Sequence, residues 1–149
     1  MQDETKKLGL EELFREVVSE MSANLATFAE TLRTTTPNSE CCQEAYCIAH
    51  SLHGSGKLYG YPCVSELGAS LEKLTKALQD CRTPPTPALA SLIASCSTAL
   101  SGLADATVPD ETARATIRDL AWECECALHA TPDAAPSPID PEAASPASQ

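Results

Sequence analysis

Aromatic side chains are scarce in this sequence: 4% of its 149 residues are Phe, Tyr or Trp. A core with few aromatics is built from Leu, Ala, Val and Ile, which suits packed helices better than a β-sheet. Basic side chains are also few, with 10 Lys and Arg against 21 Asp and Glu and a net charge of −11. Because phosphate groups are bound by clustered Lys and Arg, this balance argues against nucleic acid or an anionic membrane as the main partner.

Signals for targeting and for metal binding are missing as well. No basic segment followed by an apolar run opens the chain, and no stretch approaches about 18 apolar residues, so we expect a cytoplasmic protein without a membrane span. The eight cysteines include no Cys-x-x-Cys pair, and Cys124 and Cys126 would lie about 200° apart on a helix. We therefore expect no metal site and no cofactor, with most thiols serving as small hydrophobic side chains.

Clusters of turn-forming residues divide the chain into five segments. They fall at 34–38, 60–62, 83–87 and 105–109, and each segment between them carries the apolar period of a helix. Beyond about residue 131 the composition changes to Pro, Ala, Ser and Asp, which cannot form a core. The sequence therefore predicts one all-α domain over residues 1–130 and a disordered tail over 131–149.

Apolar residues mark the face of each segment that we expect to be buried. The second segment is expected to run from about Ser39, as its N-cap, to about Leu58, and the third to begin with Pro62 in its first turn. Gly9 is expected to separate a short leading turn from the first segment. Short connections make neighbouring helices antiparallel, which predicts an up-and-down bundle. The expected core positions are Leu10, Phe14, Val17, Met21, Leu25, Phe28 and Leu32; Ala45, Ile48, Ala49 and Leu52; Val64, Leu67, Leu71, Leu74 and Leu78; Leu89, Leu92, Ile93, Cys96, Leu100 and Leu103; and Ala113, Ile117, Leu120, Ala121, Cys124 and Leu128.

His50 is singled out because helical geometry places it on the solvent side of the second segment. At about 100° per residue, it falls roughly 140° from the centre of the apolar stripe. Tyr46, His53 and Lys57 lie one or two turns away on the same flank, and Gly54 lies one turn further on. The sequence therefore predicts a displayed histidine with polar neighbours.

Two glycines of the same segment, Gly54 and Gly56, call for a reason, because an exposed mid-helix glycine costs about 0.5–1 kcal/mol relative to Ala. One interpretation is access: without a Cβ beside His50, another protein's active site can come close to the imidazole. The other is that the helix ends near Ser55 and that both glycines belong to its C-cap. The sequence leaves these two interpretations open.

The third segment supplies a carboxylate beside the histidine face. Glu72 lies next to the buried stripe of its helix, and Ser65, Gly68 and Ala69 share that flank as a smooth surface of small residues. A carboxylate that accepts a hydrogen bond from imidazole Nδ1 fixes the tautomer and leaves Nε2 as the nucleophile. The alternative is that Glu72 is a solvated helix carboxylate.

The run from Ala49 to Glu72 resembles the motif of the histidine phosphotransfer (HPt) domain family, which occurs in phosphorelay proteins and in the first domain of chemotaxis histidine kinases. That motif reads Ala-His-x-Leu-Lys-Gly, with a second glycine ten residues after the histidine and Leu-Glu closing about 22 residues after it, the spacing found here. The match covers 24 residues without a gap, and the rest of the chain matches only in helix count and order. The matching positions are Ala49, His50, Leu52, Gly54, Gly60, Leu71 and Glu72.

The resemblance implies an up-and-down antiparallel four-helix bundle, allowing for an extra short N-terminal helix. It implies that His50 accepts a phosphoryl group from a sensor histidine kinase or a receiver aspartate and passes it to a response regulator. Gly54 would admit the partner's acidic site, Glu72 would orient the imidazole, and the receiver would supply Mg²⁺. The surface that binds the partner would include Tyr46, Gly54, Gly60, Ser65, Gly68 and Ala69.

One position departs from the family pattern. The family has Lys three residues after the phosphoacceptor, where this chain has His53. A lysine is a permanent cation, whereas imidazole is only partly charged near neutral pH. Lys57, one turn further on the same flank, is a candidate to supply the missing charge to the phosphoryl oxygens beside His53. The alternative is that His53 is a neutral surface residue and Lys57 a solvated cation.

The leading interpretation is therefore a phosphocarrier rather than an enzyme, because no Gly-rich phosphate loop follows a strand and no ATP-binding domain is recognisable. A second interpretation is an HPt-like interaction module that binds a receiver or kinase without carrying phosphate. A third, more distant interpretation is a cysteine-based redox or metal protein.

Overall fold

The computed structural model describes residues 2–105 and 109–129 of the chain. Over these ranges the chain forms five α-helices and no β-strand, which confirms the all-α prediction. The predicted tail over 131–149 and the side chain of Leu10 lie outside the described residues. The helices are α1 (Gln2–Thr34), α2 (Ser39–Tyr59), α3 (Pro62–Gln79), α4 (Pro87–Asp105) and α5 (Asp110–His129).

Local hydrogen bonds and backbone conformation set the ends of α2 and the start of α3. Asn38 is the N-cap of α2, because its side-chain oxygen accepts a hydrogen bond of 2.7 Å from the Cys41 N–H; the predicted N-cap, Ser39, is already the first helical residue. Gly60 ends α2 with a φ of 85°, in the left-handed region that glycine adopts without strain. Pro62 then opens α3 as predicted, since a first-turn residue needs no N–H donor.

The first helix, α1, is continuous over 33 residues. It passes through Gly9 without a break, so the short leading turn or helix that we expected at the N-terminus does not form within residues 2–34. The physical reason is that glycine disfavours a helix by only about 1 kcal/mol, which is not enough to end one in the absence of other breaking residues.

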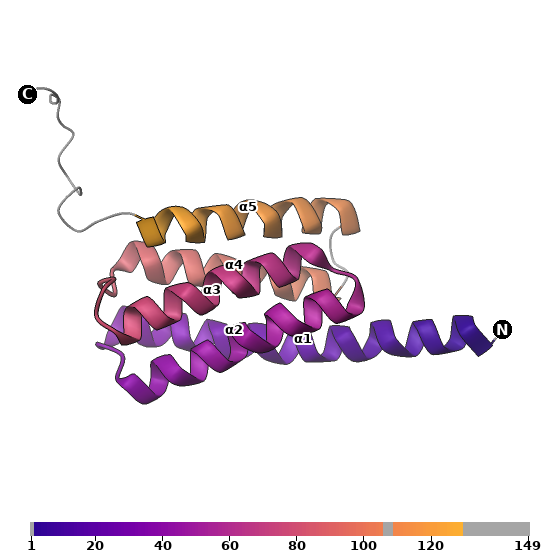
Figure 1. The fold of residues 1–149 in the computed structure, drawn as a ribbon, viewed down its shortest axis with the longest axis horizontal. Coiled ribbons are helices and arrows are strands. Elements are labelled where there is room, and N and C mark those ends of the chain that lie inside the picture. Colours follow the sequence, from indigo (N-terminus) through magenta and orange to yellow (C-terminus); the bar gives the residue numbers. More distant parts are fainter. Residues whose placement is uncertain (1, 106–108, 130–149) are drawn as a thin grey trace, which may run out of the picture.

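Consecutive helices run in opposite directions, so that α1, α3 and α5 point one way and α2 and α4 the other (Figure 1). The closely packed pairs are α1 with α2, α2 with α3, α3 with α5, α5 with α4, and α4 with α1. The five helices therefore form a closed ring around the core, and α5 packs on both α3 and α4. The contact between α2 and α3 is the most extensive of the five.

The apolar stripes predicted from the sequence form most of this core. All five predicted positions of α3, from Val64 to Leu78, are buried. In α1 the buried valine is Val18, and the predicted Val17 lies half-buried at the edge of the face that α1 presents to the bundle. Four other predicted core residues also lie at the edge of the buried face of their helix, where they pack against the core but stay partly exposed: Met21, Ile48, Leu92 and Leu128.

The helices α2 and α3 approach each other most closely at two glycines. A Cβ on Gly68 would clash with the backbone nitrogen of His53, and a Cβ on Gly56 would clash with the backbone nitrogen of Ser65. The interpretation of Gly56 as part of a C-cap is therefore wrong, because α2 continues to Tyr59 and buries Gly56 against α3. At both positions backbone packs on backbone.

The fourth helix, α4, is the most apolar of the five. It is the one helix in the described part of the chain that is long and apolar enough, by length and composition, to cross a membrane. Serines interrupt its apolar residues, which is why the sequence shows no unbroken run. A core helix of a soluble protein passes the same test. The side of α4 that faces α1 and α5 is buried at Leu89, Ile93, Cys96, Leu100 and Leu103.

The two kinds of glycine in α2 and α3 predict opposite effects of adding a methyl group. Gly68→Ala should lower the free energy of unfolding by roughly 1–3 kcal/mol, the usual cost of overpacking. Gly54→Ala should raise it by about 0.5–1 kcal/mol, because an added Cβ there meets nothing within 4 Å. Urea denaturation followed by circular dichroism measures both values, and equal effects of the two substitutions would contradict the close approach of the helices.

Candidate functional site

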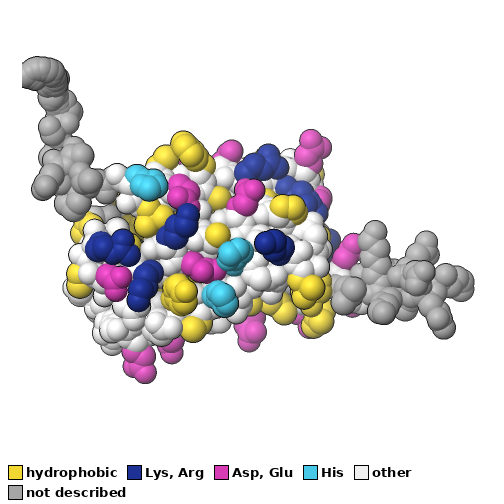
Figure 2. All heavy atoms as spheres, in the orientation of Figure 1, with side chains coloured by type: hydrophobic (Ala, Val, Ile, Leu, Met, Phe, Trp, Pro, Cys, Tyr) yellow, Lys and Arg dark blue, Asp and Glu magenta, His cyan; other side chains and the backbone are white. Residues whose placement is uncertain are grey.

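His50 lies in the middle of α2, on a side of the helix that the bundle leaves uncovered. Its side chain is 71% exposed, whereas Ala49 and Leu52 in the same turn are fully buried. The helical periodicity of the sequence thus placed His50 correctly in solvent. Figure 2 shows all three histidines of the chain on one face of the molecule.

Glu72 of α3 reaches both histidines of α2. Its Oε1 lies 2.8 Å from Nδ1 of His53 and 3.4 Å from Nδ1 of His50. The Glu72 side chain is only 18% exposed, so these contacts form at the edge of the α2–α3 interface and not in open solvent. Glu72 is therefore not a free, solvated carboxylate, but its shorter contact is to His53 and not to His50 as expected.

The carboxylate of Glu72 sets the protonation pattern of its neighbours. An ionised carboxylate can only accept hydrogen bonds, so His53 donates to it through Nδ1–H. The neutral imidazole of His53 then carries its lone pair on Nε2. His50 gains the same tautomer when its Nδ1–H is directed at Glu72, across the 3.4 Å that separates the two atoms.

Ser65 and Gly68 hold α3 against the turn of α2 that carries His53. The hydroxyl of Ser65 donates a hydrogen bond of 2.8 Å to the carbonyl oxygen of His53, and Gly68 packs on the backbone nitrogen of the same residue. Both are buried, so the prediction that they form an exposed partner surface is wrong. The reason is that α2 itself covers this flank of α3, and Ala69 is the one residue of the three that stays partly exposed.

The other predicted site residues lie around His50 on α2. Gly54 is exposed and has nothing close to the position of a Cβ, which leaves room for an approaching protein. Tyr46 lies one turn before His50, with their rings nearly parallel and their centroids 6.4 Å apart. Lys57 is exposed in the last turn of α2. Gly60 lies at the helix end, where its left-handed backbone by itself accounts for the glycine.

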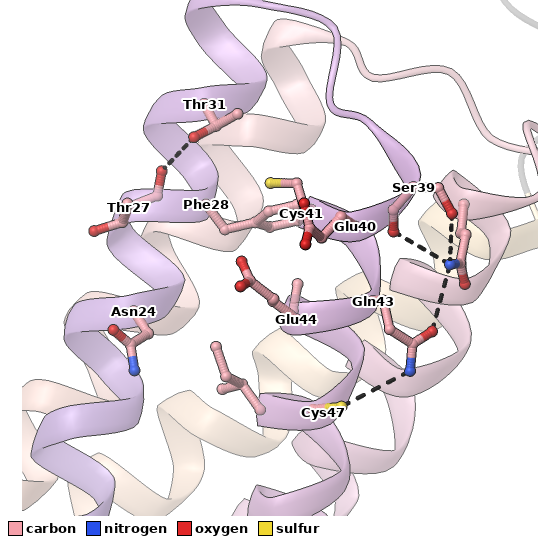
Figure 3. Close-up of a pocket in the computed structure, with 13 residues that line it drawn as sticks. Asn24, Thr27, Phe28, Thr31, Ser39, Glu40, Cys41, Gln43, Glu44 and Cys47 are labelled. Carbon is pink, nitrogen blue, oxygen red and sulfur yellow. Dashed lines mark hydrogen bonds between the residues drawn. The ribbon is translucent and has the colours of Figure 1, made fainter.

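A large hollow lies on the opposite flank of α2. Its volume is about 1010 Å³, and Figure 3 shows it between α1 and the first half of α2. Its lining includes the buried Phe28 and Ala45 and the exposed carboxylates Glu40 and Glu44. Because this hollow faces α1 while His50 faces Glu72 of α3, the two features are separate.

Three buried cysteines, Cys42, Cys63 and Cys96, are held in the unreactive thiol form. All eight cysteines are free thiols, and Cys42, Cys63, Cys96 and Cys124 are buried. Burial raises the pKa of the Cys42 and Cys63 thiols, and the hydrogen bond with Cys124 together with burial raises the pKa of the Cys96 thiol far above its usual range. Protonated thiols are poor nucleophiles and poor metal ligands. Among the residues described by the structure, no group of three or more His, Cys, Asp or Glu side chains is arranged to hold a metal ion.

The contact of Glu72 with His53 predicts a measurable tautomer. Free neutral imidazole favours the proton on Nε2, so Nδ1–H in His53 depends on its carboxylate partner. In Glu72→Leu, the ¹⁵N chemical shifts of His53 at high pH should revert to those of the Nε2–H form. Glu66→Leu is the control, because Glu66 lies on the α5 side of the same helix. Unchanged His53 shifts in Glu72→Leu would contradict the hydrogen bond.

Comparison of this chain with protein-family models, with curated proteins and with solved structures finds no match. The function is therefore inferred from the residues that surround His50.

Proposed function

We propose that the protein is a phosphorelay intermediate, in which His50 accepts a phosphoryl group from a receiver aspartate or a sensor histidine kinase and passes it to a response regulator. The observation that carries the proposal is an exposed imidazole beside the largely buried carboxylate of Glu72, at the spacing of the HPt motif. Imidazole is a good nucleophile near neutral pH, and a phosphohistidine is labile enough to hand its group on.

His50 supplies the nucleophile in this reaction. Its Nε2 lone pair attacks the phosphorus of an aspartyl phosphate, a P–N bond forms, and the P–O bond to the aspartate breaks as the aspartate leaves as a carboxylate. The proton on Nδ1 stays in place, and the carboxylate of Glu72, 3.4 Å away, stabilises the positive charge that develops on the ring. Mg²⁺ and the acidic residues that bind it belong to the receiver. The reverse sequence loads the next receiver.

His53 and Lys57 supply positive charge beside the phosphoryl group. When His53 is protonated, its charge is held next to the acceptor by the 2.8 Å contact with Glu72. Lys57 adds a permanent cation on the same flank of α2. Cations beside a transferring phosphoryl group stabilise the charge on its oxygens.

The proposal includes the fold, the location and the partner kinase that the resemblance to HPt domains implies for this setting. In this setting the phosphoacceptor lies on the second helix, α2, of an up-and-down bundle of four helices, into which a fifth, α5, is inserted between α3 and α4. The antiparallel order of consecutive helices supports this arrangement (Figure 1). The protein acts in the cytoplasm as a carrier, and ATP chemistry belongs to a separate sensor histidine kinase.

A second candidate function is an interaction module that binds a receiver or a kinase without carrying phosphate. The observation that favours it is the pairing of Glu72 with His53: the carboxylate makes its shorter contact with the residue that replaces the family's lysine, and not with His50.

The assignment of His50 predicts where a phosphoryl label is found. Incubation with receiver domains carrying ³²P-labelled aspartyl phosphate should give an acid-labile label on the wild-type chain. His50→Gln should remove it to background, while His53→Gln, the matched control on the same flank, should keep it. Undiminished label on His50→Gln would refute the assignment. No label on the wild type with several cognate receivers would favour the interaction module.

The replacement of lysine by His53 predicts a pH-dependent transfer rate. Imidazole loses its charge as the pH rises through the neutral range, whereas a lysine at this position stays charged. The transfer rate of His53→Lys divided by that of the wild type should therefore increase from about pH 6 to about pH 8. Because the two proteins differ only at position 53, the ratio isolates the effect of that residue. A constant ratio over this range would contradict a charge role for His53.

A further inference from the structure

The only tryptophan of the chain, Trp122, is 70% exposed on α5. A tryptophan buries about 150–250 Å² when it is covered, so an exposed one leaves a large apolar surface in water. Tryptophan is also enriched among the few residues that dominate the binding energy of protein interfaces. This residue therefore marks a surface that a partner can cover.

Trp122 borders a shallow hollow between α3 and α5, which we name the α3–α5 hollow. Its volume is about 390 Å³, and small side chains, Ala69 of α3 and Ala121 of α5, form part of its lining. Arg118 lies in the same lining, one turn before Trp122. A partner can therefore pack one side chain into the α3–α5 hollow and cover the protruding ring of Trp122 with another part of its surface.

Hydrogen bonds between α3 and α5 hold together the wall of this hollow that includes Ser70 and Glu125. Both Ser70 Oγ and Lys73 Nζ donate hydrogen bonds to Glu125 Oε2, at 2.8 and 3.2 Å. These bonds, that of Ser70 first, hold the pKa of the Glu125 carboxyl below its usual range. The hydrogen bonds tie α3 to α5, so the hollow lies between two helices in a fixed relation.

The α3–α5 hollow and His50 are separated by the width of one helix. Ala69 lies one turn before Glu72, which contacts His50, and Lys73 follows Glu72 and reaches α5. The helix α3 packs on both α2 and α5. Because a helix with its side chains is about 10–12 Å across and a standard interface covers about 800 Å² per partner, an interface of ordinary size centred on His50 is wide enough to reach α5.

Among the described residues, two exposed cations of the same three helices form no ion pair with a carboxylate. Figure 2 shows Lys and Arg side chains on the face that carries the histidines, with Asp and Glu side chains between them. Complementary charge steers association and suppresses wrong partners. These two cations are Lys57 in the last turn of α2 and Arg118 on α5, whereas the other three pair with carboxylates: Lys73 with Glu125, Lys76 with Asp80 and Arg114 with Asp110.

We infer that Trp122 and the α3–α5 hollow are a second contact point of the receiver domain that docks on His50. The receiver sets its acidic phosphorylation site over His50, among these cations, and packs a neighbouring apolar part of its surface on Trp122. This inference rests on the proposed function for the identity of the partner, and it adds an anchor on α5, outside the HPt-like run from Ala49 to Glu72.

Fluorescence tests this surface directly, because Trp122 is the only tryptophan and its emission reports its own environment. The probes are tryptophan-free receiver domains from the same genome, held in the phosphorylated form with Mg²⁺ and beryllofluoride. Binding should shift the emission of Trp122 to the blue. The substitution Trp122→Ala should raise the Kd about tenfold or more. Leu13→Ala, which removes another exposed apolar side chain on α1, should leave the Kd within about twofold.

A second readout separates this inference from the proposed function. Phosphoramidate, a small donor that needs no docking surface, should label His50 equally in the wild type and in Trp122→Ala. Receivers that bind and label His50 with no effect on Trp122 emission or on the Kd of Trp122→Ala would overturn the inference and leave the phosphocarrier intact. Receivers that bind with the blue shift but never label His50 would support the docking surface and favour the interaction module. Failure of every receiver to bind the wild-type chain would overturn the inference.

Discussion

The close contact of α2 with α3 is the constraint on which the site depends. Gly56 and Gly68 let the two backbones touch, and the hydroxyl of Ser65 ties α3 to the carbonyl of His53. This contact fixes the register of one helix against the other. Because Glu72 lies one turn beyond Gly68, the same register brings its carboxylate to the two imidazoles of α2. A methyl group at Gly68 would therefore change both the stability and the site geometry.

One carboxylate shared by two histidines gives the site a particular chemistry. Glu72 is mostly screened from solvent, while His50 is open to it, so the imidazole is accessible and the carboxylate is protected. The shorter contact to His53 means that this residue, at the position of a lysine in the HPt family, competes with His50 for the same oxygen. The proton on His53 and the orientation of His50 are thus coupled through Glu72, which in the function that we propose connects transfer to pH.

The docking surface that we propose combines unpaired cations with apolar area. The net charge of −11 belongs to the whole sequence, whereas Lys57 and Arg118 are exposed on α2 and α5. The exposed Trp122 on the same face adds apolar area that charge alone does not provide. In the complex that we propose, charge guides the encounter and the tryptophan holds the two proteins together.

The sequence by itself determined the helices, most of the core and the exposure of His50, because these follow from the 3.6-residue period and from local turn residues. It did not determine which flank of α3 is covered. Gly54, Gly56 and Gly68 look alike in the sequence, yet Gly54 is open and the other two are packed against backbone. Ser65 and Gly68 were expected on the surface and are buried, and Glu72 was expected to serve His50 and lies closer to His53. Only the tertiary structure decided these points, because they depend on how far one helix slides and rotates against another, and no single helix encodes that relation.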